Sequence, residues 1–241
     1  MSSLNLYHST LDAHRAQLDV VKEYRSATFE FVIDQLNLRG VYEYVQRPEF
    51  ATNLGYHNTG HCIRMAMRAY EIYQLESMHS YLDRKFDEYE LPTLILAALF
   101  HDFGHTGTRP DINNIEIAVA GLRAYDGAMP LPKRCIDLAE RLIRVTEFPF
   151  IHEPQTELEK IIRDADMMES FEPFHIATIL YNLRKELKSV QGDVSVKEAA
   201  ALQEKFVSHI EILTNAGRAI WERTKPFMLD SMWRHAEIAP E

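Results

Sequence analysis

The sequence predicts an all-α fold, a single compact bundle of roughly eight or nine helices. Apolar residues recur three and four positions apart along most of the chain, which is the period of amphipathic helices. No stretch shows the alternation of apolar and polar residues that is typical of a half-buried strand. Most glycines and prolines fall between the helical stretches, where they mark the connections.

The first half of the chain is predicted to contain four helices or fewer, separated by clear breaks. Residues 8–38 have mostly helical spacing and precede Gly40, so we expect one or two amphipathic helices that stop at this glycine. Pro48 begins a break. A further helix is expected over residues 58–79. The next one, over residues 91–103, is too apolar to be exposed, and its C-terminal end carries the sequence HDFGH.

The second half continues the helical pattern. Its predicted helices cover about residues 115–125, 133–146, 157–168, 172–189, 195–220 and 227–235. A chain of 241 residues is long enough for one large core, so we expect one domain over residues 1–241. Within it, residues 1–50 form an N-terminal helical part and residues 51–241 contribute the helices of the candidate metal site and substrate pocket.

Composition limits the possible binding partners and the cellular compartment. The formal charge is -10 and no stretch is densely basic, which argues against a long nucleic acid and leaves a small anionic substrate that a bound metal would attract. Cys62 and Cys135 are too few for a disulfide scaffold and fit a reducing compartment. The N-terminus lacks a secretory pattern, and the longest apolar run is about half the ~20 residues of a membrane span. We therefore expect a cytoplasmic protein without a membrane association; its oligomeric state is open, a homodimer included.

HDFGH is the stretch that could carry chemistry. His101 and Asp102 offer an imidazole nitrogen and a carboxylate oxygen from one point of the backbone, and these are ligand types of hydrolytic divalent metals. His57 and His61 lie four residues apart, so they would share a helix face if the helix already includes His57. A metal site needs further ligands from other elements, and a downstream carboxylate is expected to complete it.

The segment KIIRDADMMES supplies two candidate carboxylates, Asp164 and Asp166. Side chains two apart on a helix point in different directions, so only one of them is expected to face the site. The other is expected on the helix surface or beside Arg163.

These residues, in this order, resemble the HD-domain metal-dependent phosphohydrolases, whose ligand pattern is H...HD...D on helices. YHNTGH at 56–61 is similar to the YHNxxH motif of the class I cyclic nucleotide phosphodiesterases, and HDFGHTG at 101–107 is similar to their HDxxHxG motif. RDADMM resembles their segment with the last aspartate. The resemblance extends from Tyr56 to Met168.

The resemblance implies that two divalent metal ions, of zinc, manganese, magnesium or iron, polarise the phosphate and activate a water as hydroxide. It implies that Asp102 bridges both ions and that the first ion is held by His61, His101, Asp102 and Asp166. The resemblance implies that His105 does not bind the metal itself but hydrogen-bonds a metal-bound water.

His57 is implied to be the general acid that protonates the departing ribose oxygen. A metal ligand must be a neutral imidazole and a general acid must be protonated, so His57 should keep some distance from the metals while His61 contacts one. A neighbouring carboxylate could keep His57 charged, and Glu116 and Glu147 are the candidates.

Gln203 and Phe206 resemble the Q-x-x-F element with which these phosphodiesterases hold a purine: the amide bonds the base edge and the ring stacks on its face. The alternative is an exposed glutamine and a core phenylalanine on an amphipathic helix. Tyr56, the first residue of the YHNxxH match, is assigned to the same substrate pocket.

The predicted activity is hydrolysis of a 3',5'-cyclic nucleotide of the cyclic AMP or cyclic GMP type to the 5'-monophosphate. The small-molecule nucleotide is then the partner. Two alternatives keep the metals and change the substrate: a nucleotidase or other phosphomonoesterase, and a cyclic-dinucleotide hydrolase. A non-catalytic helical regulatory module is a third, and the complete metal set together with His57 argues against it.

Overall fold

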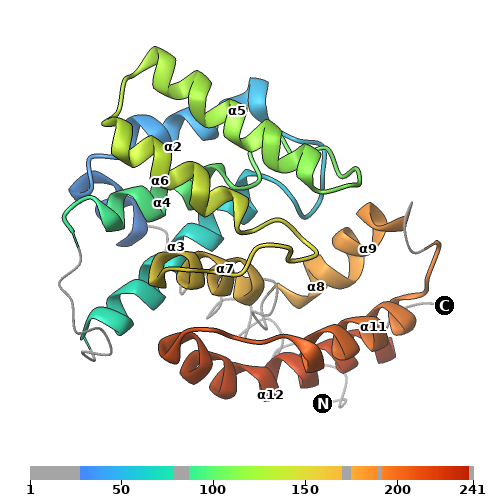
Figure 1. Ribbon diagram of the computed structural model, residues 1–241. Coiled ribbons are helices and arrows are strands. Elements are labelled where there is room, and N and C mark those ends of the chain that lie inside the picture. The colour runs from blue at the N-terminus through green and yellow to red at the C-terminus, as the bar shows by residue number, and fades with distance from the viewer. Residues whose placement is uncertain (1–27, 79–86, 170–174, 189–191, 239–241) are drawn as a thin grey trace, which may run out of the picture. The chain divides into compact units, whose positions relative to one another are not determined.

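The computed structural model describes residues 28–78, 87–169, 175–188 and 192–238. All regular elements in these ranges are helices, which confirms the all-α class (Figure 1). By their internal contacts, residues 1–39 and 40–241 form two compact units. The single domain over the whole chain stays a prediction. The helix expected from residue 8 lies outside the described residues up to residue 27.

The described part of the first unit is a helix over residues 28–35 and its C-terminal cap. Asn37 has a positive φ of 55°, and the N–H of Leu38 bonds the carbonyl of Ile33. This pattern is a Schellman cap, in which an asparagine replaces the usual glycine. The prediction that Gly40 stops the helix is therefore wrong, because Asn37 already ends it.

A fully buried helix, α4 (Glu90–Phe100), lies at the centre of the second unit. Each of its residues from Thr93 to Phe100 is buried, as its apolar sequence predicts. It packs against four other helices, which shield it from water on all sides. The elements of this part are α2 (Arg39–Val45), η1 (Pro48–Phe50), α3 (Thr59–Met78), α5 (Ile112–Ala128), α6 (Lys133–Arg144) and α7 (Glu157–Glu169), of which α3, α5, α6 and α7 contact α4.

A second group of helices follows α7. α8 (Ile176–Thr178), η2 (Ile179–Leu183) and α9 (Arg184–Glu186) run on directly from one another, with a π-helical turn in the middle. Such turns are rare and occur mostly at functional sites. They are followed by α11 (Val196–His209) and α12 (Asn215–Ile238), which pack against each other.

The predicted boundaries of the last two helices are wrong. One helix was expected over residues 195–220, but the chain leaves helical geometry at Ile210 and starts α12 at Asn215. A break was expected at Pro226, but α12 continues through it. Proline removes one backbone hydrogen bond, and the burial of Met228 and Met232 beyond it compensates for that loss.

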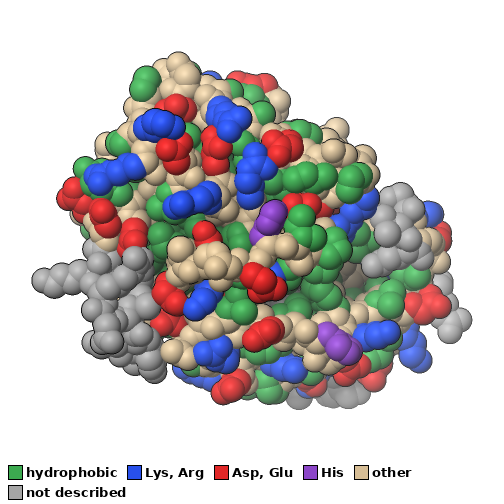
Figure 2. All heavy atoms as spheres, viewed as in Figure 1, with side chains coloured by type: hydrophobic (Ala, Val, Ile, Leu, Met, Phe, Trp, Pro, Cys, Tyr) green, Lys and Arg blue, Asp and Glu red, His purple; other side chains and the backbone are tan. Residues whose placement is uncertain are grey.

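None of the described helices combines the length and the apolar character that crossing a membrane requires. On the face seen in Figure 2, basic and acidic side chains alternate over the surface without a continuous basic track.

Asp164 fastens the start of α12 to α7. Its side chain is buried and accepts hydrogen bonds from the backbone N–H groups of Leu213 and Thr214, both at 2.8 Å, and from the Thr214 hydroxyl at 2.7 Å. The N–H groups at a helix start lack partners within the helix, so a carboxylate there supplies acceptors. Asp164 is therefore neither on the helix surface nor paired with Arg163, whose guanidinium lies over the Phe150 ring.

Replacing Asp164 with alanine should lower the free energy of unfolding by about 3 kcal/mol, because buried N–H groups lose their acceptor. Urea unfolding followed by circular dichroism measures the change. Asp193→Ala is the matched control, since this exposed aspartate pairs with exposed Lys188 and its loss should change stability by about 0.5 kcal/mol or less. Equal effects of both variants would contradict the anchoring role.

Candidate metal centre and cavity

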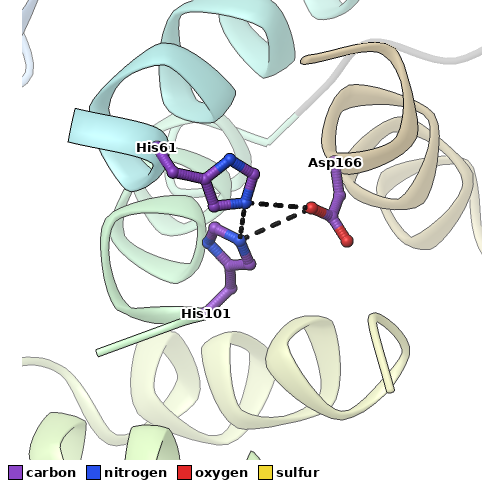
Figure 3. Close-up of side chains that lie close together, drawn as sticks. All are labelled: His61, His101 and Asp166. Atoms are coloured by element: carbon purple, nitrogen blue, oxygen red, sulfur yellow. Dashed lines mark hydrogen bonds and ion pairs between the residues drawn. The ribbon is translucent and has the colours of Figure 1, made fainter. Parts of the chain in front are cut away.

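Side chains from three helices meet inside the second unit. His61 lies in the first turn of α3, His101 directly follows α4, and Asp166 lies on α7 (Figure 3). The two Nε2 atoms are 3.1 Å apart. Asp166 Oδ1 lies 3.4 Å from the first and 3.6 Å from the second. The three ligand-type atoms thus surround one point.

The start of α3 explains the position of His61. The side chain of Asn58 accepts a hydrogen bond from the His61 N–H at 3.2 Å, which makes Asn58 the cap of this helix. The helix begins at Thr59, so His57 precedes it. The two histidines therefore do not share a helix face, and their ring centroids are 6.0 Å apart.

The HDFGH segment is a tight turn and not the last turn of α4, which ends at Phe100 instead of the predicted residue 103. Gly104 has a φ of 70°, a conformation that favours glycine. Phe103 turns away from the metal site and contacts the rings of Phe50 and Phe100, with centroid distances of 4.8 and 5.2 Å. This aromatic contact fixes the turn so that His101 and Asp102 face the opposite side.

Asp102 completes the cluster. Its Oδ2 lies 3.3 Å from His61 Nε2 and 3.4 Å from His101 Nε2, yet this buried oxygen accepts no hydrogen bond from the described residues. Burial raises the pKa of Asp102, but the neighbouring imidazoles lower it by more. The net pKa is therefore well below the usual range. The same balance lowers the pKa of Asp166. Both side chains are therefore carboxylates at neutral pH.

The tautomer of His101 suits a metal ligand. Its Nδ1–H donates a 2.8 Å hydrogen bond to the carbonyl of Ala98, which leaves the lone pair of Nε2 directed at the centre. Burial lowers the pKa of His101, but Asp102 raises it more, so the centre attracts positive charge. Ligands about 2.1 Å from one cation lie about 3.0 to 3.4 Å apart, close to the spacings found here. The residues present therefore fit a divalent cation.

His57 lies beside this centre and is paired with a carboxylate that the sequence did not indicate. Its Nδ1 is 2.6 Å from Glu186 Oε2, and the other Glu186 oxygen accepts the Tyr56 N–H. Burial raises the pKa of Glu186, but the bonds from His57 and Tyr56 lower it below its ordinary value. The pair is separated by 129 positions, so no local pattern could reveal it.

The two carboxylates predicted to face His57 are elsewhere. Glu116 forms an ion pair with Arg144 on the outside of α5 and α6. Glu147 lies 3.7 Å from His152. The prediction that Glu116 or Glu147 faces His57 is therefore wrong, because Glu186 occupies that position.

His105 contacts His57 rather than the metal-ligand cluster. Their rings are stacked, with centroids 4.1 Å apart and planes inclined by 13°. The Nδ1 of His105 accepts the Gly107 N–H at 3.0 Å, and its Nε2 is 3.7 Å from Asp111 Oδ1. The predicted bond from His105 to metal-bound water stays a prediction.

A cavity of about 550 Å³ opens beside these residues. Gln203 and Phe206 of α11 line it together with Tyr56, as do Asp102 and Asp166 at its metal end. Gln203 is buried rather than exposed, and its Nε2 has no partner among the described residues. The structure thus brings the predicted substrate residues and two of the four predicted ligands, Asp102 and Asp166, to one cavity.

Arg184 of α9 is a cavity residue that the sequence did not single out. Its Nη1 donates to the carbonyl of Val194, and its buried Nε has no hydrogen-bond partner in the described part of the chain. An arginine in a helical, charge-rich segment carries no sequence signal for a pocket position, so only the fold could reveal it.

Residues 56–122 match the sequence model of a family described as 3'5'-cyclic nucleotide phosphodiesterase. The match ends before α7, so Asp166 lies outside it. Comparison of the chain with curated proteins and with solved structures finds no match. The family match confirms the resemblance carried by YHNTGH and HDFGHTG, and it supports a hydrolase that acts as a cyclic nucleotide phosphodiesterase.

Manganese or zinc titrated into metal-free protein should bind and raise the melting temperature, because a cation neutralises two buried carboxylates. His101→Ala should weaken metal affinity at the tightest binding site by about 100-fold or more. Loss of a ligand should cost at least as much affinity as loss of a residue that only hydrogen-bonds a ligand. Isothermal titration calorimetry measures the affinities, and differential scanning calorimetry measures the melting temperature. His152→Ala, which changes a half-exposed histidine, is the control. Unaltered affinity in His101→Ala would refute this assignment.

Proposed function

We propose that this chain hydrolyses a 3',5'-cyclic nucleotide to the 5'-monophosphate with His57 as the general acid. The observation that carries the proposal is the His57–Glu186 pair at 2.6 Å, which lines the same cavity as Asp102 and Asp166 of the candidate ligand cluster. A histidine with a carboxylate partner beside a buried cation site suits cleavage of a phosphoester with a poor leaving group.

In this proposal His61, His101, Asp102 and Asp166 hold the first divalent cation. Asp102 also lines the cavity, which supports the proposal that its carboxylate would bind both the first cation and a second one. When bound, such cations polarise the phosphate and lower the pKa of water, which is the chemistry that the side chains themselves cannot supply. Zinc, manganese, magnesium and iron all suit nitrogen and oxygen donors of this kind.

Glu186 orients His57 for proton delivery. The lowered pKa of Glu186 keeps its carboxylate charged at neutral pH, so that it is an acceptor for the imidazole of His57. The Nδ1–H donates to Glu186, so Nε2 is the nitrogen that delivers a proton to the leaving ribose oxygen. The protonated oxygen departs as the 3'-hydroxyl of the monophosphate.

The far part of the cavity suits a purine. Phe206 offers a flat ring, held edge to face by Phe148 at 5.7 Å. Gln203 and Arg184 each present a buried N–H donor without a partner among the described residues. Guanine offers two acceptors on one edge, O6 and N7, whereas adenine offers one acceptor and one donor. Two donors therefore favour the base of cyclic GMP over that of cyclic AMP.

We place the enzyme in the cytoplasm, as one domain that acts on a small-molecule nucleotide. Both cysteines, Cys62 and Cys135, are buried free thiols, which fits a reducing compartment.

His57→Ala should lower kcat for the cyclic nucleotide by about 10²- to 10⁴-fold and leave metal affinity unchanged, because the general acid is lost and the ligands remain. Glu186→Gln should lower kcat less, since the acid is kept but loses its partner. Steady-state kinetics and calorimetry test both variants. Loss of metal from His57→Ala would show that His57 is a ligand and that its role was misassigned.

Wild-type protein supplied with manganese or magnesium should convert cyclic GMP faster than cyclic AMP. Arg184→Gln should lower the ratio of kcat/KM for cyclic GMP to kcat/KM for cyclic AMP by about tenfold. This change corresponds to about 1.4 kcal/mol of discrimination between the bases. Chromatography of the products measures the rates. Arg223→Gln, a change of the same kind on the exposed side of α12, is the control.

The same assay includes cyclic dinucleotides and 5'-monophosphates. Release of inorganic phosphate from monophosphates, with cyclic nucleotides untouched, would replace the proposed function with that of a nucleotidase. Turnover of cyclic dinucleotides alone would replace the substrate. No turnover of any substrate by metal-loaded protein would favour a regulatory module.

A further inference from the structure

We infer that Asp111 is a positioning residue for the general acid: it holds the imidazole of His105, and His105 holds the ring of His57. The inference rests on the proposed function and adds a residue to it. Asp111 lies in the segment GTRPDINN, immediately before α5, and lines the cavity.

Three neighbours limit the movement of His57. Glu186 bonds its Nδ1, as described above. Tyr56 meets its ring edge to face, with centroids 4.8 Å apart and planes inclined by 85°. His105 covers one face of the ring in the 4.1 Å stack. A hydrogen bond at one atom still permits the ring to swing about it, so the stacked ring is the contact that sets the plane of His57.

The orientation of His105 is set from both of its nitrogens. Gly107 donates its N–H to Nδ1, so in the neutral ring the proton is on Nε2. That N–H faces the charged oxygen Oδ1 of Asp111 at 3.7 Å, which is longer than an ordinary hydrogen bond. His105 is buried, with 8% of its surface exposed, so few other groups can reach this N–H. Without the carboxylate, Nε2 loses the acceptor that it faces.

Asp111 is itself firmly held, which a positioning residue requires. Its Oδ2 accepts the Phe148 N–H at 2.8 Å, and its Oδ1 accepts the Asn114 amide at 3.1 Å. Burial raises the pKa of Asp111, but His105 and these two donors lower it, so it is a carboxylate at neutral pH. Buried Asn114 also bonds Thr106 and Thr108, and so ties the loop after His105 to the same point.

The chemistry of the leaving group separates this role from a merely structural one. A cyclic nucleotide expels an alkoxide, which needs a proton from a well-placed acid. A p-nitrophenolate leaves without one. A residue that acts through His57 should therefore matter for the first kind of ester and little for the second, whereas damage to the metal site or the fold should slow both.

Asp111→Asn should lower kcat for the cyclic nucleotide by about 10- to 100-fold with little change in KM, as loss of an orienting partner does elsewhere. The rate with bis(p-nitrophenyl) phosphate should change little. Glu116→Gln removes the same charge from α5, where the residue pairs with Arg144, and should change neither rate. Equal loss with both esters, or no loss with either, would overturn the inference.

His105→Phe, which leaves Asp111 in place, keeps the test decisive if Asp111→Asn is unstable: alone it should lower kcat for the cyclic nucleotide and spare bis(p-nitrophenyl) phosphate, and an equal loss with both esters would overturn the inference. His105→Phe keeps a ring against His57 but removes the N–H that faces Asp111. In this background Asp111→Asn should cause no further loss with the cyclic nucleotide, because the two residues act in series. Losses that multiply would show that Asp111 does not act through His105.

His57→Ala in the same assay separates the two levels of the proposal. If it slows the cyclic nucleotide but spares the nitrophenyl ester, the general acid is correct and the Asp111 variants test the inference alone. If wild-type protein does not hydrolyse cyclic nucleotides, the proposed function fails first.

Discussion

The meeting of two imidazoles and two carboxylates inside an apolar core is the constraint on which the second unit depends. His61 and His101 are almost completely buried, and their Nε2 atoms are 3.1 Å apart. Buried charges are costly unless opposite charges or a cation compensate for them. The helices that carry these groups must therefore be held closely and rigidly. Fully buried alanines on α3 and α7, Ala66, Ala69 and Ala165, suit such an approach.

α7 shows how the core and the site are joined. Residues two apart on a helix are rotated by about 200°, so Asp164 and Asp166 point to opposite sides. Asp164 fastens the start of α12, while Asp166 faces the two histidines. One helix thus uses one carboxylate for the fold and presents the other to the candidate metal centre. Asp166 is held in place partly because Asp164 fixes the helix.

The surroundings of His57 come from distant parts of the chain. Two residues at the π-helical turn, four positions apart, hold the loop that carries His57. The Asn182 amide donates to the carbonyl of Gly55, and the Glu186 carboxylate bonds the Tyr56 N–H and the ring of His57. From the other side, His105 stacks on the ring and Asp111 faces His105. Glu186 and Asp111 thus support the candidate acid from outside the cluster, whereas His105 belongs to the same turn as His101 and Asp102.

The sequence by itself determined the all-α class, the buried character of α4 and the residues of the metal cluster, because these depend on local periodicity and on motifs with distinctive side chains. Local pattern could not show that α3 begins after His57, since that depends on the Asn58 cap. Nor could it place the start of α12, where Asp164 accepts hydrogen bonds from a segment 50 positions away.

Only the tertiary structure decided which carboxylate serves His57. Glu116 and Glu147 were reasonable from sequence, yet both lie at other contacts, and Glu186 reaches the histidine because α9 packs beside the loop before α3. Gln203 was ambiguous for the same reason: its helix is amphipathic, and only packing shows that the amide is buried at the cavity. Pairing of residues more than a hundred positions apart is set by helix packing, which leaves no trace in local spacing.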